Sequence, residues 1–193
     1  MAAAARDGLA LEERTFDWLC EQGHVGLERV AKARRDPAIV APVQAALAVL
    51  ARIFARLKGD PTVLPAARAN LLLAPLLADG ETLISVDGPE HFTSHRLAAL
   101  ELYPPDAPLG FDRAEHEALC REHAPRTDAI DRGLAAKGFG FGGVPRERAY
   151  HDALRDLAVP AMGHPPLVRV TALDGDGAAA YAAWDHGRPS PRR

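Results

Sequence analysis

Two histidines, a cysteine and a glutamate lie close together in the middle of the chain. His116, Cys120 and His123 are spaced so that, on a helix, their side chains fall within an arc of about 60°. Imidazole nitrogen and thiolate sulfur are donors that zinc accepts in a tetrahedral site. We therefore expect these three residues to bind zinc or another divalent metal. Glu117 would act as the catalytic base on a metal-bound water.

The pentapeptide at residues 116–120, His-Glu-Ala-Leu-Cys, resembles the His-Glu-x-x-His helix of zinc hydrolases. Cysteine stands here in place of the second histidine. The resemblance implies that Glu117 activates water on the metal. Because a thiolate donates more charge than an imidazole, that water would be less acidic than in the zinc hydrolases.

Other histidines and cysteines offer alternative donor sets. Cys20 and His24 have a spacing similar to that of Cys120 and His123, so a closed Cys2His2 structural zinc site is a second hypothesis. A histidine pair at residues 91 and 95, one helical turn apart, would need carboxylate partners to hold a metal. The plain alternative is that the cysteines are small buried hydrophobic residues and the histidines are solvated.

Two further motifs have a structural interpretation as well as a functional one. His151-Asp152 resembles the dipeptide of HD-type metal phosphohydrolases, and the alternative is a surface histidine on an amphipathic helix. Residues 138–143 match Gly-x-Gly-x-x-Gly, but they follow a predicted helix instead of a strand. We interpret this loop as a connector. An anion could also rest on the amides and arginines of the helix that follows, which begins at Pro145.

The elements that position these residues are mainly helical. Residues 37–57 give the clearest pattern, with apolar side chains at steps of three and four. The other predicted helices are 11–22, 25–35, 62–78, 89–103, 112–123, 127–137 and 145–157. Residues 83–86 form either a short strand or the lead-in to a helix. Residues 167–171 read as a strand.

The fold class we predict is mainly α, a bundle-like multi-helix domain with a small C-terminal β-hairpin or α+β element. The hairpin would use residues 178–184 as its return strand, or this segment is a short helix capped by Asp176. Residues 1–80 would form a helical region and residues 81–186 a helical to α+β region. The sequence leaves open whether the two regions share one hydrophobic core. Residues 187–193 read as a solvated tail.

Composition narrows the class of protein. The 193 residues include 23 basic and 26 acidic side chains, a net charge of −3, which makes nucleic acid an unlikely partner. We expect no membrane span, because the longest apolar run is short and interrupted by Pro75. With only two cysteines and no recognisable secretory signal, a cytoplasmic location is expected.

Three functions follow from these patterns, and the sequence leaves open whether the protein is an enzyme. The first is a small metal-binding protein, a metal-dependent hydrolase if Glu117 is catalytic. The second is a non-catalytic helical module that binds a protein partner or itself, with residues 71–77 as its surface. The third is a winged-helix regulator with helices at 127–137 and 145–157 and a wing at 167–184.

Overall fold

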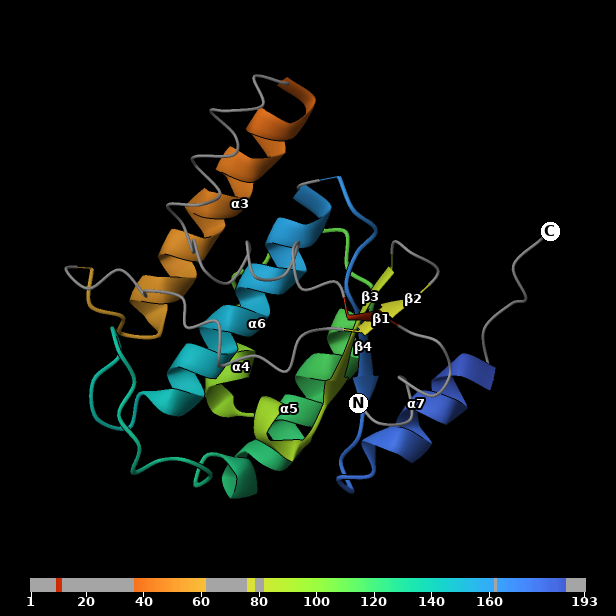
Figure 1. Ribbon diagram of the computed structural model, residues 1–193. Helices are drawn as coiled ribbons and strands as arrows, with labels where there is room; N and C mark the ends of the chain where they lie inside the picture. The colour runs from red at the N-terminus through yellow and green to blue at the C-terminus, as the bar shows by residue number, and fades with distance from the viewer. Residues whose placement is uncertain (1–9, 12–36, 62–75, 79–81, 162, 187–193) are drawn as a thin grey trace.

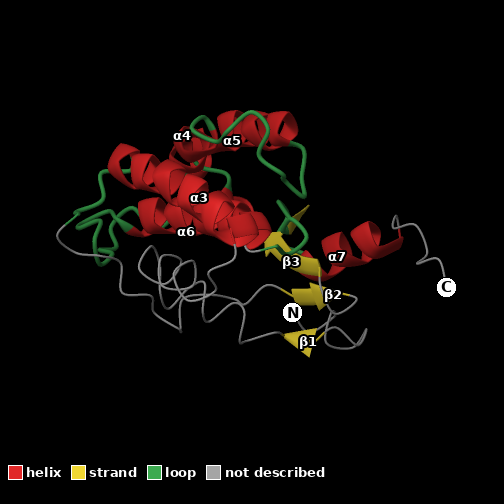
Figure 2. Ribbon diagram, turned by 90° about the horizontal axis from the view of Figure 1, so that it is seen from above, coloured by secondary structure: helices red, strands yellow, loops and turns green. Residues whose placement is uncertain are grey.

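The structure is a computed structural model that describes residues 10–11, 37–61, 76–78, 82–161 and 163–186. The described part is mainly α-helical with a small β element, as the sequence predicts (Figure 1). The β element is a four-stranded sheet. Helices α3 to α6 lie on one side of the sheet and α7 lies apart from them, close to the sheet (Figure 2). Among the described helices, none combines the length and the apolar character that a membrane crossing requires.

The sheet has the order β1-β2-β3-β4 and mixes antiparallel with parallel pairing. Its first three strands are paired antiparallel, and β3 and β4 are parallel, with Ile84 opposite Val168 and Asp87 opposite Thr171. The bounds are Ala10–Leu11 for β1, Leu76–Ala78 for β2, Thr82–Asp87 for β3 and Val168–Thr171 for β4. The carboxyl ends of β3 and β4 therefore meet at one edge.

Alternating side chains give the parallel strand pair two different faces. Ile84 and Val170 point to one face, where they form a small apolar core with Tyr181 of α7 (Gly177–His186). Leu83 belongs instead to the main core on the helical side. Residues of β3 and β4 that share the Leu83 face can thus contact the helices.

The longest helix, α3 (Pro37–Arg56), confirms the prediction for residues 37–57. Its apolar stripe is buried at Val43, Leu50 and Ile53 and contacts α6 (Val144–Ala161). Past the last turn, the amide of Gly59 donates to the carbonyl of Phe54, which closes the helix end. Helix α3, which precedes β2 in the chain, and helix α6, which follows it, both contribute side chains to this core.

Two capped helices complete the helical layer. Residues 89–103, predicted as one helix, form the short 3-10 helix η1 (Pro89–His91) and α4 (Ser94–Leu100). Thr93 divides them, because its hydroxyl accepts the amide of Arg96 as an N-cap. The cap predicted at Asp112 opens α5 (Arg113–Thr127), where its carboxylate accepts the amide of Glu115.

The structure corrects two predicted helices. Residues 128–137 are turns, since their apolar side chains Ile130 and Leu134 are exposed and give a helix nothing to bury. Of the predicted helix 62–78, residues 76–78 form strand β2 instead, and residues 62–75 lie outside the described residues. Of the two alternatives for the C-terminal segment, the short helix is confirmed: residues 177–186 form α7, and Asp176 accepts the amide of Ala179 as its cap. The predicted helices 11–22 and 25–35 and the tail 187–193 lie outside the described residues, apart from Leu11 in β1.

Candidate functional site

The parallel strands direct two opposite charges toward the helices. Asp87 is the last residue of β3, and Arg169 lies on β4. Nη1 of Arg169 donates to Oδ2 of Asp87 at 2.6 Å, and the Ser85 hydroxyl donates to Oδ1 of the same carboxylate at 2.7 Å. Both members of the ion pair are buried. A buried pair is tolerated only when its remaining polar atoms are also satisfied.

Helix α6 supplies the other carboxylates. Asp152 and Asp156 are one helical turn apart, so they point to the same side of α6. Nε of Arg169 donates to Oδ1 of Asp156 at 2.8 Å, and its Nη2 lies 3.3 Å from Oδ1 of Asp152. The fork of donors on one guanidinium therefore connects β3, β4 and α6.

Helix α4 contributes a second buried guanidinium. Nη2 of Arg96 donates to Oδ2 of Asp156 at 2.6 Å, and Nη1 donates to the Tyr103 hydroxyl at 2.8 Å. That hydroxyl in turn donates to Oδ2 of Asp156 at 2.8 Å. Burial raises the pKa of Tyr103 well above its ordinary value, so the phenol keeps its proton and remains a donor.

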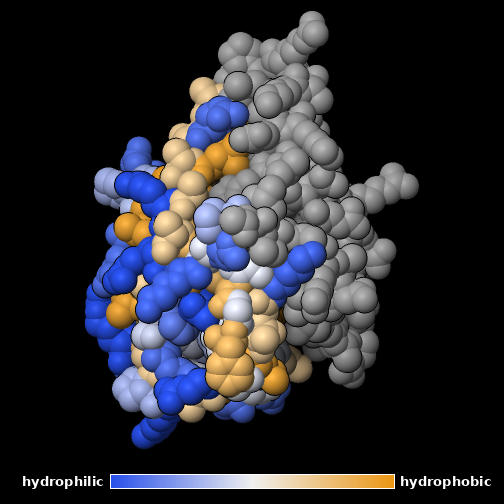
Figure 3. All heavy atoms as spheres, turned by 90° about the vertical axis from the view of Figure 1, so that its left-hand side faces the viewer, coloured by the Kyte–Doolittle hydropathy of each residue, from blue (hydrophilic) through white to orange (hydrophobic). Residues whose placement is uncertain are grey.

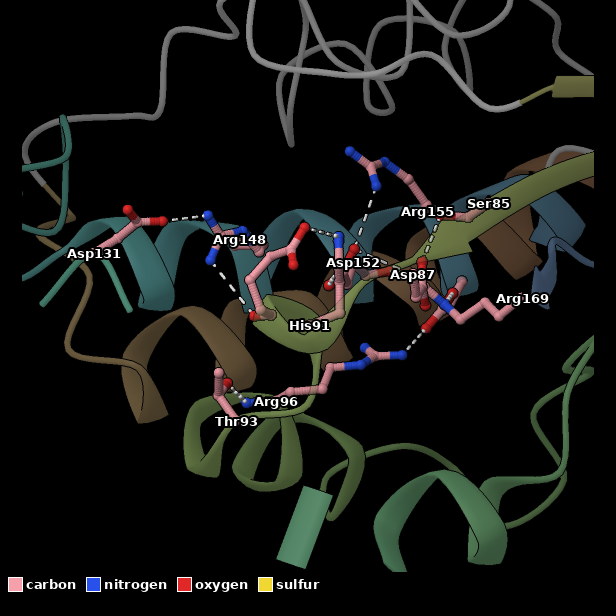
Figure 4. Close-up of polar contacts among 12 residues, drawn as sticks. Ser85, Asp87, His91, Thr93, Arg96, Asp131, Arg148, Asp152, Arg155 and Arg169 are labelled. Atoms are coloured by element: carbon pink, nitrogen blue, oxygen red, sulfur yellow. Dashed lines mark hydrogen bonds and ion pairs between the residues drawn. The ribbon is translucent and has the colours of Figure 1, made fainter. Parts of the chain in front are cut away.

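These residues form one connected network, which we call the charged cluster. Its members are Asp87, His91, Arg96, Tyr103, Asp152, Arg155, Asp156 and Arg169. Figure 4 shows six of these side chains near the end of β3, between α4 and α6: Asp87, His91, Arg96, Asp152, Arg155 and Arg169. Three carboxylates face three guanidinium groups, so the charges balance before His91 is counted.

His91 is the member of the charged cluster at its outer side. Its Nδ1 lies 2.8 Å from Oδ2 of Asp152 (Figure 4), and its side chain is 16% exposed while that of Asp152 is 1% exposed. The other ring nitrogen, Nε2, lies 4.0 Å from a carboxylate oxygen of the more exposed Glu90. The imidazole thus has one edge on a buried carboxylate and one edge toward the surface.

Electrostatics fixes the charge of the pair. Burial alone would lower the pKa of His91, but the charges of Asp152 and Asp87 outweigh it and raise the pKa above 6.5. Burial would likewise raise the pKa of Asp152, yet His91 and Arg169 hold it well below its usual range. Asp87 follows the same rule: Arg169 and His91 outweigh burial and lower its pKa to about 2. The contact therefore favours the charged pair, an imidazolium on a carboxylate, over the neutral pair.

The residues predicted to bind metal lie on α5, away from hydrogen-bond contact with one another. His116 is buried between the rings of Phe92 and Phe111, at centroid distances of 4.8 and 4.9 Å. Its Nε2 has no hydrogen-bond partner among the described residues. His123 lies edge-on to Phe92 at 6.5 Å. Within the described ranges, no three His, Cys, Asp or Glu side chains form a group that could hold a metal ion.

Cys120 and Glu117 have surroundings unlike those of a ligand and a general base. Cys120 is a buried free thiol, and burial raises its pKa to about 11, which disfavours the thiolate. Glu117 accepts from Nε of Arg113 and from Nη2 of Arg121, both at 2.9 Å. Burial would raise the pKa of Glu117, and these two hydrogen bonds lower it instead. Both of its oxygens are thus occupied by arginines.

The alternative motifs separate in the structure. The pair at 91 and 95 does not share a helix, since His91 belongs to η1 and His95 to α4. Cys20 and His24 lie outside the described residues. Of His151-Asp152, Asp152 enters the charged cluster. Burial, together with Arg155, lowers the pKa of His151 to about 4 and keeps that imidazole neutral.

The sequence analysis did not single out Asp87, Arg96, Asp156 or Arg169. Two features of the sequence could have identified Arg169 and Asp156. Arg169 interrupts an apolar β-branched strand, where a charge needs a buried partner. The aspartates at 152 and 156 repeat at one-turn spacing on a helix rich in apolar residues.

Comparison of the chain with protein-family models, with curated proteins and with solved structures found no match.

Proposed function

We propose that the protein is a hydrolase in which His91 donates a proton to the leaving group of an ester or phosphoester. The observation that carries this proposal is the 2.8 Å contact between Nδ1 of His91 and the buried carboxylate of Asp152. A base or acid held by a third group is the arrangement that proton-transfer enzymes use. His91 also follows β3 closely, and ligands of sheets with parallel strands bind at the strands' carboxyl ends.

Each neighbour has a defined part in this proposal. Asp152 accepts a hydrogen bond from the Nδ1–H group of His91. This bond orients the ring and directs Nε2 outward. Arg155 and Arg169 contact Asp152 and hold it in place, so they are positioning residues. Because the pKa of His91 is raised, its imidazole keeps the proton to a higher pH than an ordinary histidine does, which suits it to act as an acid.

Phenyl esters test the proposal without a known substrate. We would measure the release of phenol from phenyl acetate, phenyl phosphate and diphenyl phosphate, with and without added magnesium or zinc, because phenolate is basic enough to need a proton as it leaves. His91→Gln should lower the rate by about 100-fold or more. The matched control is His186→Gln, an exposed histidine on α7. Equal rates for the two variants, or no hydrolysis above the buffer rate by the native chain, would refute the proposal.

A second readout separates proton transfer from folding. Asp152→Asn should lower the pKa of His91, which the chemical shift of the imidazole reports in an NMR titration. The alkaline limb of the rate profile, where a general acid loses its proton, should move to lower pH by the same amount. If the variant is folded and the pKa of His91 stays where it was, Asp152 does not orient the acid.

One observation favours a second candidate function, non-catalytic protein binding. The large hydrophobic side chains that are exposed in the described part are Ile130 at 38%, Leu134 at 55% and Phe141 at 81%. All three lie in the segment that joins α5 to α6. Exposed apolar residues grouped in this way are typical of an interaction surface.

Self-association is the simplest form of this second function. Light scattering after size exclusion should give a mass above 20.6 kDa for the native chain and the monomer mass for Leu134→Ser/Phe141→Ser. A matched control is Ala135→Ser, an exposed position in the same segment. A monomer mass for all three proteins would exclude self-association through this segment.

A further inference from the structure

A pocket of about 490 Å³ lies apart from the charged cluster and shares no residue with it. Its walls come from the end of α3, the turn that follows, the start of α4 and the start of α6. Four of the lining residues carry basic side chains: Arg56, Lys58, His95 and Arg146. Among the described residues that line the pocket, none is acidic. Figure 3 shows the side of the molecule that α3 reaches, where hydrophilic residues gather with smaller apolar areas between them.

Hydrogen bonds to backbone carbonyls hold two sides of this pocket in place without a ligand. Nη2 of Arg146 donates to the carbonyls of Phe139 and Phe141, at 2.6 and 3.0 Å, so the arginine is tied to the glycine loop. On the facing side, the amide of Asp60 donates to the carbonyl of Gly138 at 2.7 Å. The turn after α3 and the glycine loop are thus joined. A site of this kind loses little conformational entropy when it binds.

The positive charges in the pocket are only partly compensated by the described residues, through the carboxylate of Asp128, which accepts the amide of Ser94 at 2.9 Å. Arg56 and Lys58 form no ion pair with any residue in the described ranges. His95 is affected from several elements: burial lowers its pKa, Asp128 raises it, and Arg146 and Lys58 lower it further. The basic groups therefore repel one another across a shared space. An anion placed between them would relieve that repulsion.

We propose that this pocket binds the phosphate groups of a small phosphorylated molecule. Arginine and lysine are the side chains best suited to phosphate, arginine through paired hydrogen bonds and lysine through its concentrated charge. The volume is that of a small-molecule site and exceeds what a single inorganic phosphate needs. The ligand class we infer therefore carries two phosphates, or one phosphate with an organic group.

Calorimetric titration with pyrophosphate, ADP and adenosine tests the proposal on the full chain. Pyrophosphate and ADP should bind with a Kd on the order of 0.1–1 mM, and adenosine should not bind. Arg56→Glu/Lys58→Glu should weaken pyrophosphate binding by roughly tenfold or more. The control Arg52→Glu/Arg126→Glu makes the same change of net charge at exposed positions outside the pocket, and should bind as the native chain does.

A pH series gives an independent check. An anion beside His95 raises the pKa of this histidine, so binding of sulfate, whose charge is constant near neutral pH, should tighten as the pH falls. His95→Gln should remove that dependence. Equal weakening in both charge-reversal variants would mean a general effect of net charge and would overturn the proposal. So would binding of a DNA duplex without saturable binding of pyrophosphate.

Discussion

Arg169 of β4 reaches Asp87 of β3 with a separation of 2.6 Å, and neither side chain is accessible to solvent. The two residues belong to the only parallel strand pair in the described sheet. The same guanidinium contacts Asp152 and Asp156 of α6. One side chain therefore connects three carboxylates from two layers of the fold, and its removal should have large effects.

Substitution Arg169→Leu should lower the free energy of unfolding by about 3–5 kcal/mol, because the buried carboxylate of Asp87 loses the guanidinium that pairs with it. Urea unfolding followed by circular dichroism measures the change. Arg121→Leu serves as the control, since it breaks an ion pair to Glu117 on the surface. That control should cost no more than about 1 kcal/mol. A similar decrease in the free energy of unfolding in the two variants would mean that the buried ion pairs of Arg169 stabilise the fold no more than a surface pair does.

Stability should fall on the acid side of pH 6.5. Burial, with Arg96 and Arg169, lowers the pKa of His116 to about 4 in the folded chain. Between pH 6.5 and about 4, His116 is protonated in the unfolded chain but not in the folded chain. The contribution of the neutral His116 to the stability of the fold is therefore complete above pH 6.5 and is lost as the pH falls. His116→Leu should make urea midpoints less dependent on pH over this interval. His186→Leu should not.

His91 should act in the opposite direction. Its pKa is raised in the folded chain, so its contribution to stability is complete below pH 6.5 and is lost as the pH rises through the folded pKa. His91→Gln should remove this alkaline loss and leave the acid loss in place. An unchanged slope above pH 6.5 in the variant would show that the contact with Asp152 does not stabilise the charged imidazole.

The thiol of Cys120 should be inert in the folded chain. It is fully buried and its pKa is raised to about 11 by burial. In a Cys20→Ser background, reaction with a disulfide reagent should therefore wait for unfolding, and its rate should rise steeply with urea. Reaction as fast as that of free cysteine would place this thiol at the surface.

Zinc binding at His116, Cys120 and His123 stays a prediction from sequence, and it can be measured directly. Phe92 contacts the rings of both histidines, so a shared ion would require this packing to rearrange. We expect added zinc to leave the unfolding temperature unchanged. A rise of several degrees that disappears in Cys120→Ala would establish the site instead.

The sequence predicted local features better than it predicted the site. The apolar stripe of α3 and the cap at Asp112 depend on neighbouring residues, so periodicity and capping rules find them. The charged cluster depends on partners far apart, such as His91 with Asp152 and Arg96 with Asp156. No spacing rule connects such residues. The histidines of α5 attracted attention because their spacing is local, although their rings pack against phenylalanines.

The hydrogen bond between Asp87 and Arg169 spans 82 positions in the chain. The three acidic partners of Arg169 all precede it in the chain, and Asp87 can pair with it only after β4 has joined β3. Closing so long a loop is entropically costly and slows folding. We therefore expect the parallel strand pair to form late in folding, with the carboxylate of Asp87 hydrated until then.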